Sequence, residues 1–182
     1  MNRSFRTAEL TQMALLTALL CISAYIVIPL PFTPVSLTAQ TLMVNLIALL
    51  LTPQQAAFTI GAYILLGLAG LPVFSGAMGG PRKLFGPTGG YIMSWIPAVI
   101  LMSQLKGKHY CFRRYLLVTI LIGMPVIYLF GTAYMNLLTG MGWSASLTAA
   151  VIPFIPLDLF KCAAAVLIAK PVQIALSQFS AS

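Results

Sequence analysis

Leu71-Pro-Val-Phe-Ser-Gly-Ala-Met-Gly-Gly-Pro-Arg-Lys-Leu-Phe-Gly-Pro-Thr-Gly-Gly-Tyr91 is the stretch around which this chain is organised. It holds six glycines and three prolines between two long apolar runs. Inside a helix, glycine costs about 1 kcal/mol and proline about 3 kcal/mol relative to alanine. Residues 71–89 are therefore predicted to form a loop, whose backbone can approach another group closely because glycine has no Cβ.

The composition of the whole chain indicates an integral membrane protein with a single domain, residues 1–182. The chain is 60% hydrophobic and only 7% charged, whereas a soluble domain carries about 25% charged residues. Its formal charge of +8 would suggest nucleic acid as a partner of a soluble protein. In a membrane protein, basic residues collect in cytoplasmic loops instead. We therefore expect contact with the lipid bilayer and no nucleic-acid partner.

The apolar runs predict an all-α fold, with six transmembrane helices in a compact bundle and an outward-facing ligand pocket. About 20 helical residues cross a hydrocarbon core of about 30 Å. The first run has this length and no clear small-residue cleavage site follows it, so we expect it to remain in the mature protein. Pro29, Pro31 and Pro34 predict a stiff connection after it. The expected spans are residues 8–28, 37–51, 56–70, 90–105, 115–138 and 156–176.

The basic residues predict the orientation of these spans. An even number of spans places both termini on one side of the membrane. The loop side then holds only Arg82 and Lys83, and Lys161 lies within a span. The terminal side holds seven of the ten basic residues: Arg3, Arg6, Lys106, Lys108, Arg113, Arg114 and Lys170. By the positive-inside rule, both termini are cytoplasmic, the loop is outside, and the protein is a multi-pass protein of the plasma membrane.

Of all the acidic and basic residues in the sequence, only Asp158 and Lys161 lie within a predicted span and away from its cytoplasmic end. Three positions apart on a helix, they share a face and can pair. Each charge costs about 2.5 to 3.5 kcal/mol on insertion scales, so such residues usually face a polar cavity and mark a functional site. The alternative is that Asp158 caps a helix end while Lys161 extends to the interface.

The outer loop and this charged pair together predict a pocket for a small amphipathic molecule with an acidic group. In the short second span, Gln40 is expected to face a cavity, since an amide facing lipid would lose its hydrogen-bond partners. Arg82 and Lys83 would favour an anion at the entrance, although they could equally be solvated loop charges. The remaining expected ligand contacts are backbone N–H groups of Gly79 and Gly80, and the apolar rings of Phe74 and Tyr91.

Neither a metal site nor a catalytic residue is expected. Cys21, Cys111 and Cys162 lack metal-ligand spacing and are interpreted as unpaired apolar residues. His109 lies in a basic loop without an acidic neighbour. No Gly-x-x-x-x-Gly-Lys-Ser/Thr motif is present. If the protein moves a solute uphill, another subunit must therefore supply the energy.

Several of these motifs resemble the BioY family, the biotin-specific S components of energy-coupling-factor (ECF) transporters. The resemblance implies that the protein captures external biotin as a transported ligand, without a cofactor. It also implies association with a transmembrane coupling subunit and two cytosolic ATPase subunits. The motifs are Leu66-Gly-Leu-Ala-Gly-Leu-Pro-Val-Phe74, Gly79-Gly80, Gly86-Pro-Thr-Gly-Gly-Tyr91 and Pro156-Leu-Asp-Leu-Phe-Lys161.

The resemblance also suggests roles for single residues. Ala14 and Ala18 form a small-xxx-small pair that permits close helix approach, and they resemble the alanine pair by which S components dock on the coupling subunit. Some members carry an asparagine in place of Met78 and an arginine in place of Ile92, both implicated in holding biotin. Our hypothesis is that Arg82 or Lys83 supplies the missing cation near the carboxylate.

Three alternatives remain at this point. The protein could be an S component for another small acidic vitamin or cofactor, to which the departures at Met78 and Ile92 lend weight. An intramembrane enzyme could use Asp158 as acid or base, but no serine, cysteine or histidine stands at a spacing that suggests a nucleophile. A channel is disfavoured because no repeated polar face follows a path across the membrane.

Overall fold

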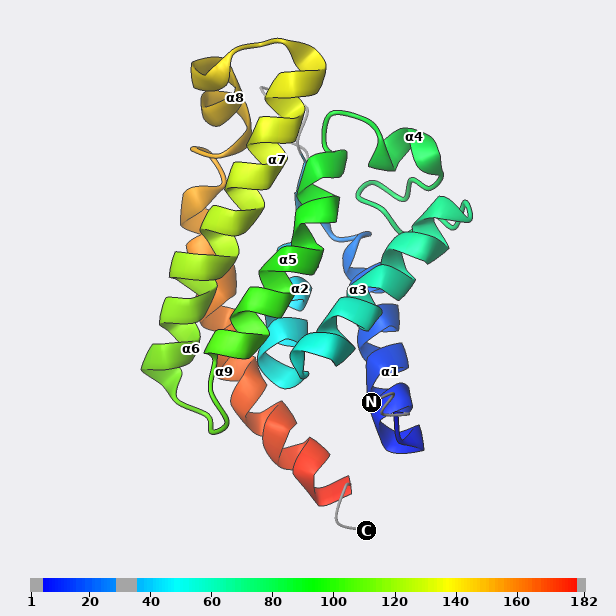
Figure 1. Ribbon diagram of the computed structural model, residues 1–182, viewed down its shortest axis with the longest axis vertical. Coiled ribbons are helices and arrows are strands. Elements are labelled where there is room, and N and C mark those ends of the chain that lie inside the picture. The colour runs from blue at the N-terminus through cyan, green and yellow to red at the C-terminus, as the bar shows by residue number, and fades with distance from the viewer. Residues whose placement is uncertain (1–4, 29–35, 180–182) are drawn as a thin grey trace.

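Helices form most of the protein in the computed structural model, which describes residues 5–28 and 36–179. Figure 1 shows an elongated bundle with both chain ends toward the same pole. The elements are α1 (Thr7–Ser23), β1 (Val27–Ile28), β2 (Leu37–Thr38), α2 (Gln40–Leu50), α3 (Pro53–Leu68), α4 (Pro81–Leu84), α5 (Gly89–Leu105), α6 (Phe112–Val118), the π-helical turn η1 (Thr119–Gly123), α7 (Met124–Thr139), α8 (Trp143–Ala150) and α9 (Ile155–Phe179).

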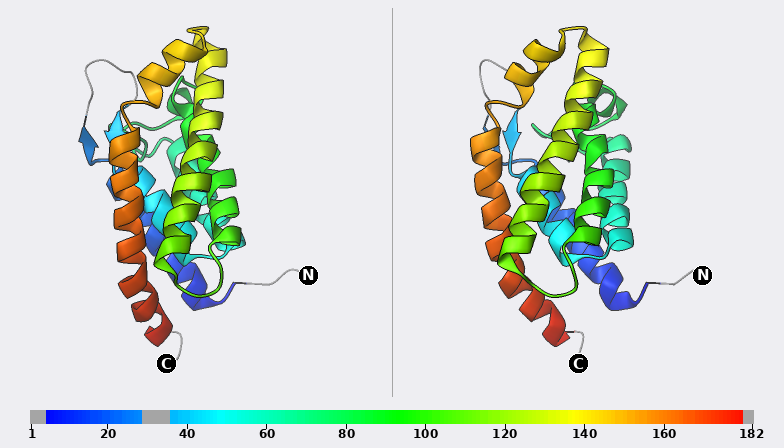
Figure 2. Two further views of the ribbon diagram at one scale, coloured as in Figure 1. Left: turned by 90° about the vertical axis from the view of Figure 1, so that its left-hand side faces the viewer. Right: turned by 60° about the vertical axis from the view of Figure 1, so that its left-hand side comes forward.

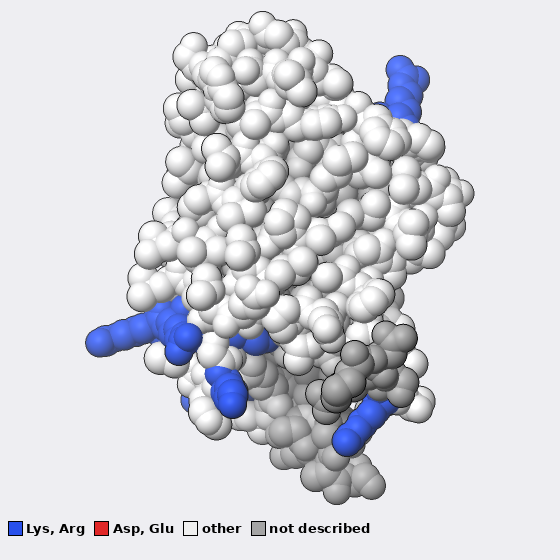
Figure 3. All heavy atoms as spheres, in the orientation of Figure 1, with Lys and Arg blue, Asp and Glu red and all other residues white. Residues whose placement is uncertain are grey.

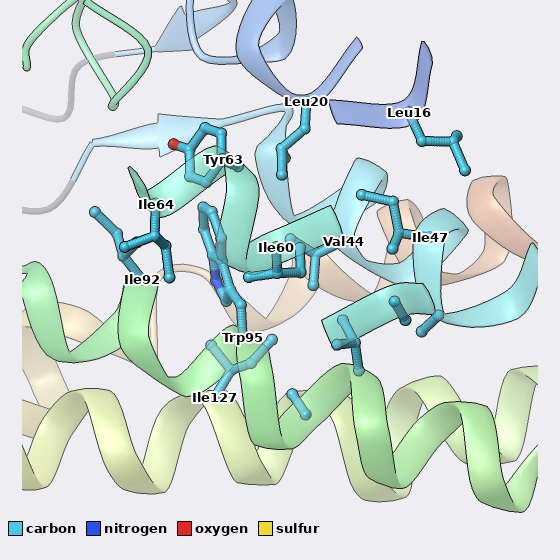
Figure 4. Close-up of a cluster of buried hydrophobic side chains, with 14 of the residues drawn as sticks. Leu16, Leu20, Val44, Ile47, Ile60, Tyr63, Ile64, Ile92, Trp95 and Ile127 are labelled. Carbon is cyan, nitrogen blue, oxygen red and sulfur yellow. The ribbon is translucent and has the colours of Figure 1, made fainter. Parts of the chain in front are cut away.

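α5 is the central helix of the bundle. It packs against α2, α3 and α7, while α9 packs mainly on α2 and α1 on α3. Figure 4 shows the resulting core, in which Ile60 and Tyr63 of α3 face Trp95 of α5. The Tyr63 and Trp95 rings lie 5.7 Å apart between centroids. This aromatic contact fixes the spacing of the two helices that flank the glycine-rich loop.

The first predicted span, residues 8–28, extends beyond the helix that the structure contains. α1 ends at Ser23, and Val27–Ile28 then pair antiparallel with Leu37–Thr38. Ile28 precedes Pro29, and a residue before proline is disfavoured in the helical region and adopts extended backbone. The protein is mostly helical as expected, and this short pair is an exception. The expected proline connection over 29–34 and Arg3 lie outside the described residues.

The longest helical segments lie in the C-terminal half of the chain and run along the long axis of the bundle, as Figure 2 shows. Phe112–Thr139, with 28 residues, and Ile155–Leu176, with 22, are long and apolar enough by length and composition to cross a membrane. The first of these continuous segments widens at η1. Pro125 has no N–H to donate to the carbonyl four residues earlier, which favours such a local widening. α1, α2 and α5 are shorter apolar helices.

Lys106 joins two helices at the pole that holds the chain ends. It follows the last residue of α5, and its Nζ donates hydrogen bonds to the carbonyl oxygens of Ala48 (2.9 Å), Leu49 (2.8 Å) and Leu51 (2.5 Å). The carbonyls at the end of α2 have no partner within their own helix. The ammonium helps to satisfy them, together with Ser103 Oγ on Ala48 and Gln173 Nε2 on Leu49. Burial lowers the pKa of Lys106 to about 8, while the three carbonyl oxygens favour the charged form. Lys106 therefore has a structural role, unlike the exposed basic residues Lys108, Arg113 and Arg114 that follow it in the chain.

Lys106→Met is expected to destabilise the protein by about 1.5–3 kcal/mol, the range for hydrogen bonds to a charged group. The reason is that three carbonyls lose a charged donor: the Leu51 carbonyl is left without one among the described residues, while those of Ala48 and Leu49 keep a hydrogen bond from Ser103 Oγ and Gln173 Nε2, respectively. Thermal unfolding in an uncharged detergent measures the effect. Lys108→Met is the matched control, because Lys108 is exposed two residues away. Equal unfolding temperatures for the two variants would contradict this role of Lys106.

Candidate ligand-binding site

Asp158 and Lys161 form a buried ion pair in the first turns of α9. Lys161 Nζ lies 2.9 Å from Asp158 Oδ1, and the two residues are 9% and 7% exposed, respectively. Their spacing of three residues places them on one face of the helix. That face is turned toward α2, against which α9 packs. The expected pairing is therefore present, and neither residue extends to solvent as in the alternative interpretation.

Two hydroxyl groups from other helices complete the environment of this pair. Thr41 Oγ1 on α2 donates a hydrogen bond to Asp158 Oδ1 (3.2 Å) and accepts one from Lys161 Nζ (3.0 Å). Tyr128 on α7 donates its hydroxyl to Asp158 Oδ2 at 2.6 Å. Thus both carboxylate oxygens are satisfied, which offsets the cost of removing the charges from water. We call Thr41, Tyr128, Asp158 and Lys161 the polar network.

The polar network lines a cavity of about 80 Å³. Four aromatic rings line the cavity, those of Tyr91, Trp95, Tyr128 and Phe154. The other lining residues are Ser36, Leu37, Thr38, Gln40, Ser75, Thr88, Ile92, Ile127 and Ala150. A small set of convergent polar groups within an apolar wall is typical of small-molecule binding sites.

Gln40 connects this cavity to the outer loop. Its Nε2 donates to the hydroxyl of Tyr63 at 2.5 Å, and that hydroxyl donates to the carbonyl of Val73 at 3.0 Å. Tyr91, in turn, shares a hydrogen bond of 2.9 Å with Thr132 on α7. Both site residues are therefore held in fixed orientations by hydrogen bonds to neighbouring elements.

The first half of the glycine-rich loop is anchored on α3. Phe74 is fully buried and contacts the Tyr63 ring at 5.6 Å between centroids. A Cβ on Gly67 would lie only 2.1 Å from the Phe74 ring, so the ring requires glycine beneath it. The Gly80 N–H donates to the Gly67 carbonyl at 2.7 Å. Phe74 therefore anchors this half of the loop in the packed core, while residues 76–78 are exposed.

The residues expected to contact a ligand consequently fall into three groups. Gln40, Tyr91, Asp158 and Lys161 line the inner cavity together. Gly79 and Arg82 line a second, outer cavity. The remaining two, Phe74 and Gly80, anchor the loop on α3.

Sequence reasoning missed the roles of Tyr128 and Trp95 in this site. A single tyrosine or tryptophan in an apolar helix carries no signal that distinguishes a cavity from the core. Thr41 did carry one, because it follows Gln40 in a short span with several polar residues. Among the described residues, no group of three His, Cys, Asp or Glu side chains could hold a metal ion.

Comparison with known proteins places this chain in a family. Residues 1–178 match the model of the BioY family. The chain belongs to the BioY family. The probable biotin transporter BioY of Pyrococcus horikoshii is 38% identical over 168 residues, covering 92% of this chain and 98% of the relative. The biotin transporter BioY of Thermotoga maritima is 34% identical over 161 residues, covering 88% and 93%.

A similar fold has also been determined experimentally. A crystal structure of the S component for biotin from an ECF-type ABC transporter matches this structure with a TM-score of 0.84. The sequences are 26% identical, and the match covers 93% of this chain and 95% of the other. The helical arrangement described above is thus the fold of that S component.

Proposed function

We propose that this BioY protein is a substrate-binding S component that captures biotin for uptake by an ECF-type transporter. It is a binding subunit of a transporter and not an enzyme. The observation that carries the proposal is the polar network, in which a buried ion pair from α9 lies at the wall of a cavity that aromatic and aliphatic side chains also line. Family membership and the similar S component support biotin as the ligand.

The chemistry of biotin suits this cavity. Its ureido ring offers directed hydrogen bonds, its thiophane ring an apolar surface, and its carboxylate a partner for a cation. Lys161 Nζ uses two of its three N–H groups within the protein, which leaves one for a ligand. We propose that Gln40, Tyr91, Asp158 and Lys161 contact biotin directly.

The experiment is calorimetric titration of the purified protein with biotin. The protein is prepared from cells grown without biotin, and mass spectrometry identifies any small molecule that co-purifies. One-to-one binding with recovery of unchanged biotin is expected. Chemical turnover would support the enzyme alternative instead, and absence of binding would overturn the assignment of biotin.

A different small acidic vitamin is the second candidate, and one residue favours it. Ile92, which stands where some family members have an arginine, is 5% exposed and lines the cavity. The inner wall therefore offers no cation at that position. Lipoate and nicotinate are suitable competing probes in the same titration, since each has a carboxylate on a different apolar body. Tighter binding of either probe than of biotin would favour this second candidate.

We also propose a topology of six membrane spans, with both termini in the cytoplasm and the cavity open to the outside. The spans would be α1, α2, α3, α5, the continuous α6–η1–α7 segment and α9. Figure 3 supports this orientation, because blue side chains gather on its visible face near the pole of the chain ends. Cysteine-accessibility labelling in intact cells tests it: a cysteine introduced at Met78 should react from outside. Reaction only after cell lysis would contradict the orientation.

The coupling subunit and two cytosolic ATPase subunits are the proposed partners, with α1 as the docking helix. Ala14 and Ala18 are exposed on this helix, where a larger side chain would hold a partner helix away. Ala14→Phe with Ala18→Phe should retain biotin binding but lose co-purification with the coupling subunit. Leu167→Phe, at a position 61% exposed on α9, is the control and should assemble normally. Normal assembly of the α1 variant would exclude this docking face.

A further inference from the structure

The glycine-rich loop lines a second cavity that is larger and more open than the inner one. This outer cavity has a volume of about 470 Å³, compared with about 80 Å³ for the inner cavity. Thr88 lines both, so the two lie next to each other. The outer cavity is lined by Met78, Gly79, Arg82, Lys83, Gly86, Pro87 and Thr88.

The two cavities differ in charge. In the inner cavity, the charge of Lys161 is balanced by Asp158 at 2.9 Å. In the outer cavity, Arg82 and Lys83 both carry positive charge, and neither side chain has a hydrogen-bond or ion-pair partner among the described residues. The chain has only two acidic residues in total. Asp158 is occupied within the polar network, and Glu9 accepts a hydrogen bond from the Arg6 N–H.

One of these two charges is partly buried. Lys83 is only partly exposed, and burial lowers its pKa below the usual value, whereas Arg82 is exposed. The loop around it is closely packed: a Cβ on Gly79 would lie 2.4 Å from the Leu71 carbonyl oxygen, and one on Gly86 would lie 2.9 Å from the Arg82 carbonyl oxygen. The cations therefore lie on a backbone that is fixed by its own packing, beside the inner cavity.

We propose that the outer cavity is an anion-binding site, at which the carboxylate of an acidic ligand is held by Arg82 and Lys83 before the ligand enters the inner cavity. This site rests on the proposed function and adds an order of events to it. Arg82 and Lys83 speed the association of the ligand with the protein, while the polar network holds the ligand once it is bound. This role differs from replacing the missing cation inside the pocket, because neither side chain lines the inner cavity.

The physical consequence is electrostatic steering. A cavity lined with charge of one sign raises association rates by about 10- to 1,000-fold, and the gain falls steeply with ionic strength. Dissociation is governed by contacts in the final complex and is little affected by charges outside it. Arg82 and Lys83 should therefore change the association rate of an anionic ligand, but not its dissociation rate.

Trp95 provides a reporter for this experiment. It is 4% exposed and lines the inner cavity, and the chain has only one other tryptophan, Trp143. In a Trp143→Phe background, stopped-flow fluorescence thus follows arrival at the inner cavity. Biotin and its neutral amide are the probes, in an uncharged detergent at low and high salt. The variant is Arg82→Gln with Lys83→Gln. Lys108→Gln with Arg113→Gln is the matched control, because it removes two exposed charges elsewhere.

The loop variant is expected to bind biotin with an association rate about ten-fold lower at low salt, and with an unchanged dissociation rate. The difference should disappear at high salt and with the amide. The variant Arg82→Lys with Lys83→Arg keeps both positive charges, and it should bind biotin at the association rate of the parent. Such a result would show that the slower association of the loop variant comes from lost charge and not from a folding defect. Equal slowing for biotin and its amide, faster dissociation of biotin, or an unchanged association rate would each overturn the outer site while leaving biotin capture intact. Failure of the parent protein to bind biotin at all would overturn the proposed function and the outer site together.

Discussion

Lys161→Met is expected to weaken biotin binding by about 10- to 100-fold and to destabilise the protein by about 3–5 kcal/mol. The loss of affinity corresponds to one hydrogen bond from a charged donor. The loss of stability is the cost of removing one partner from a buried ion pair. It arises because the buried Asp158 would lose its cationic partner and keep only the hydroxyl groups of Thr41 and Tyr128 as donors. Calorimetry with biotin and thermal unfolding of the ligand-free protein measure the two effects.

The double variant Asp158→Asn with Lys161→Met separates stability from binding. It leaves no unpaired charge in the cavity, and the asparagine oxygen can still accept from Tyr128. Most of the stability should therefore return, while biotin affinity should stay low. Strictly additive stability losses would show that the two charges are not coupled. A variant that no longer inserts into the membrane would favour a purely structural role for the pair.

The polar network shows which parts of the site could be predicted from sequence. Asp158 and Lys161 could be paired in advance because they are close in sequence and are charged in an apolar segment. Their hydroxyl partners could not, because Thr41 is 117 residues from Asp158 and meets it only through the packing of α2 against α9. Tyr128 reaches Asp158 from α7 in the same way. Helix content follows from local composition, whereas the partners of a buried charge follow from tertiary packing.

The glycine-rich stretch gives a different lesson. Glycine was expected to let the backbone of Gly-Gly-Tyr91 approach another group closely. In the structure, that group is another part of the same chain. A Cβ on Gly89 would lie 1.6 Å from the Leu84 carbonyl oxygen, and one on Gly90 would lie 2.3 Å from Cβ of Tyr134. Across the same helix pair, Tyr91 packs on Gly131. Sequence indicates that glycine is needed, but only the structure shows what approaches it.

Gly90→Ala is therefore expected to destabilise the protein by about 1–3 kcal/mol or more, the cost of inserting atoms into a packed interface. The contact is with Tyr134 Cβ, which lies next to the backbone, so α5 and α7 must move apart. Tyr91 and Ile92 lie directly after Gly90 and line the inner cavity, so biotin affinity should fall as well. Thermal unfolding and titration with biotin measure both effects.

Gly61→Ala is the matched control for this change, because a Cβ at Gly61 in α3 would meet nothing within 4 Å. Alanine is favoured over glycine in a helix by about 1 kcal/mol, so this variant should be as stable as the parent or more stable. The two identical substitutions thus have opposite expected signs. If both shifted the unfolding temperature equally, glycine at position 90 would be required for a reason other than the approach of α7.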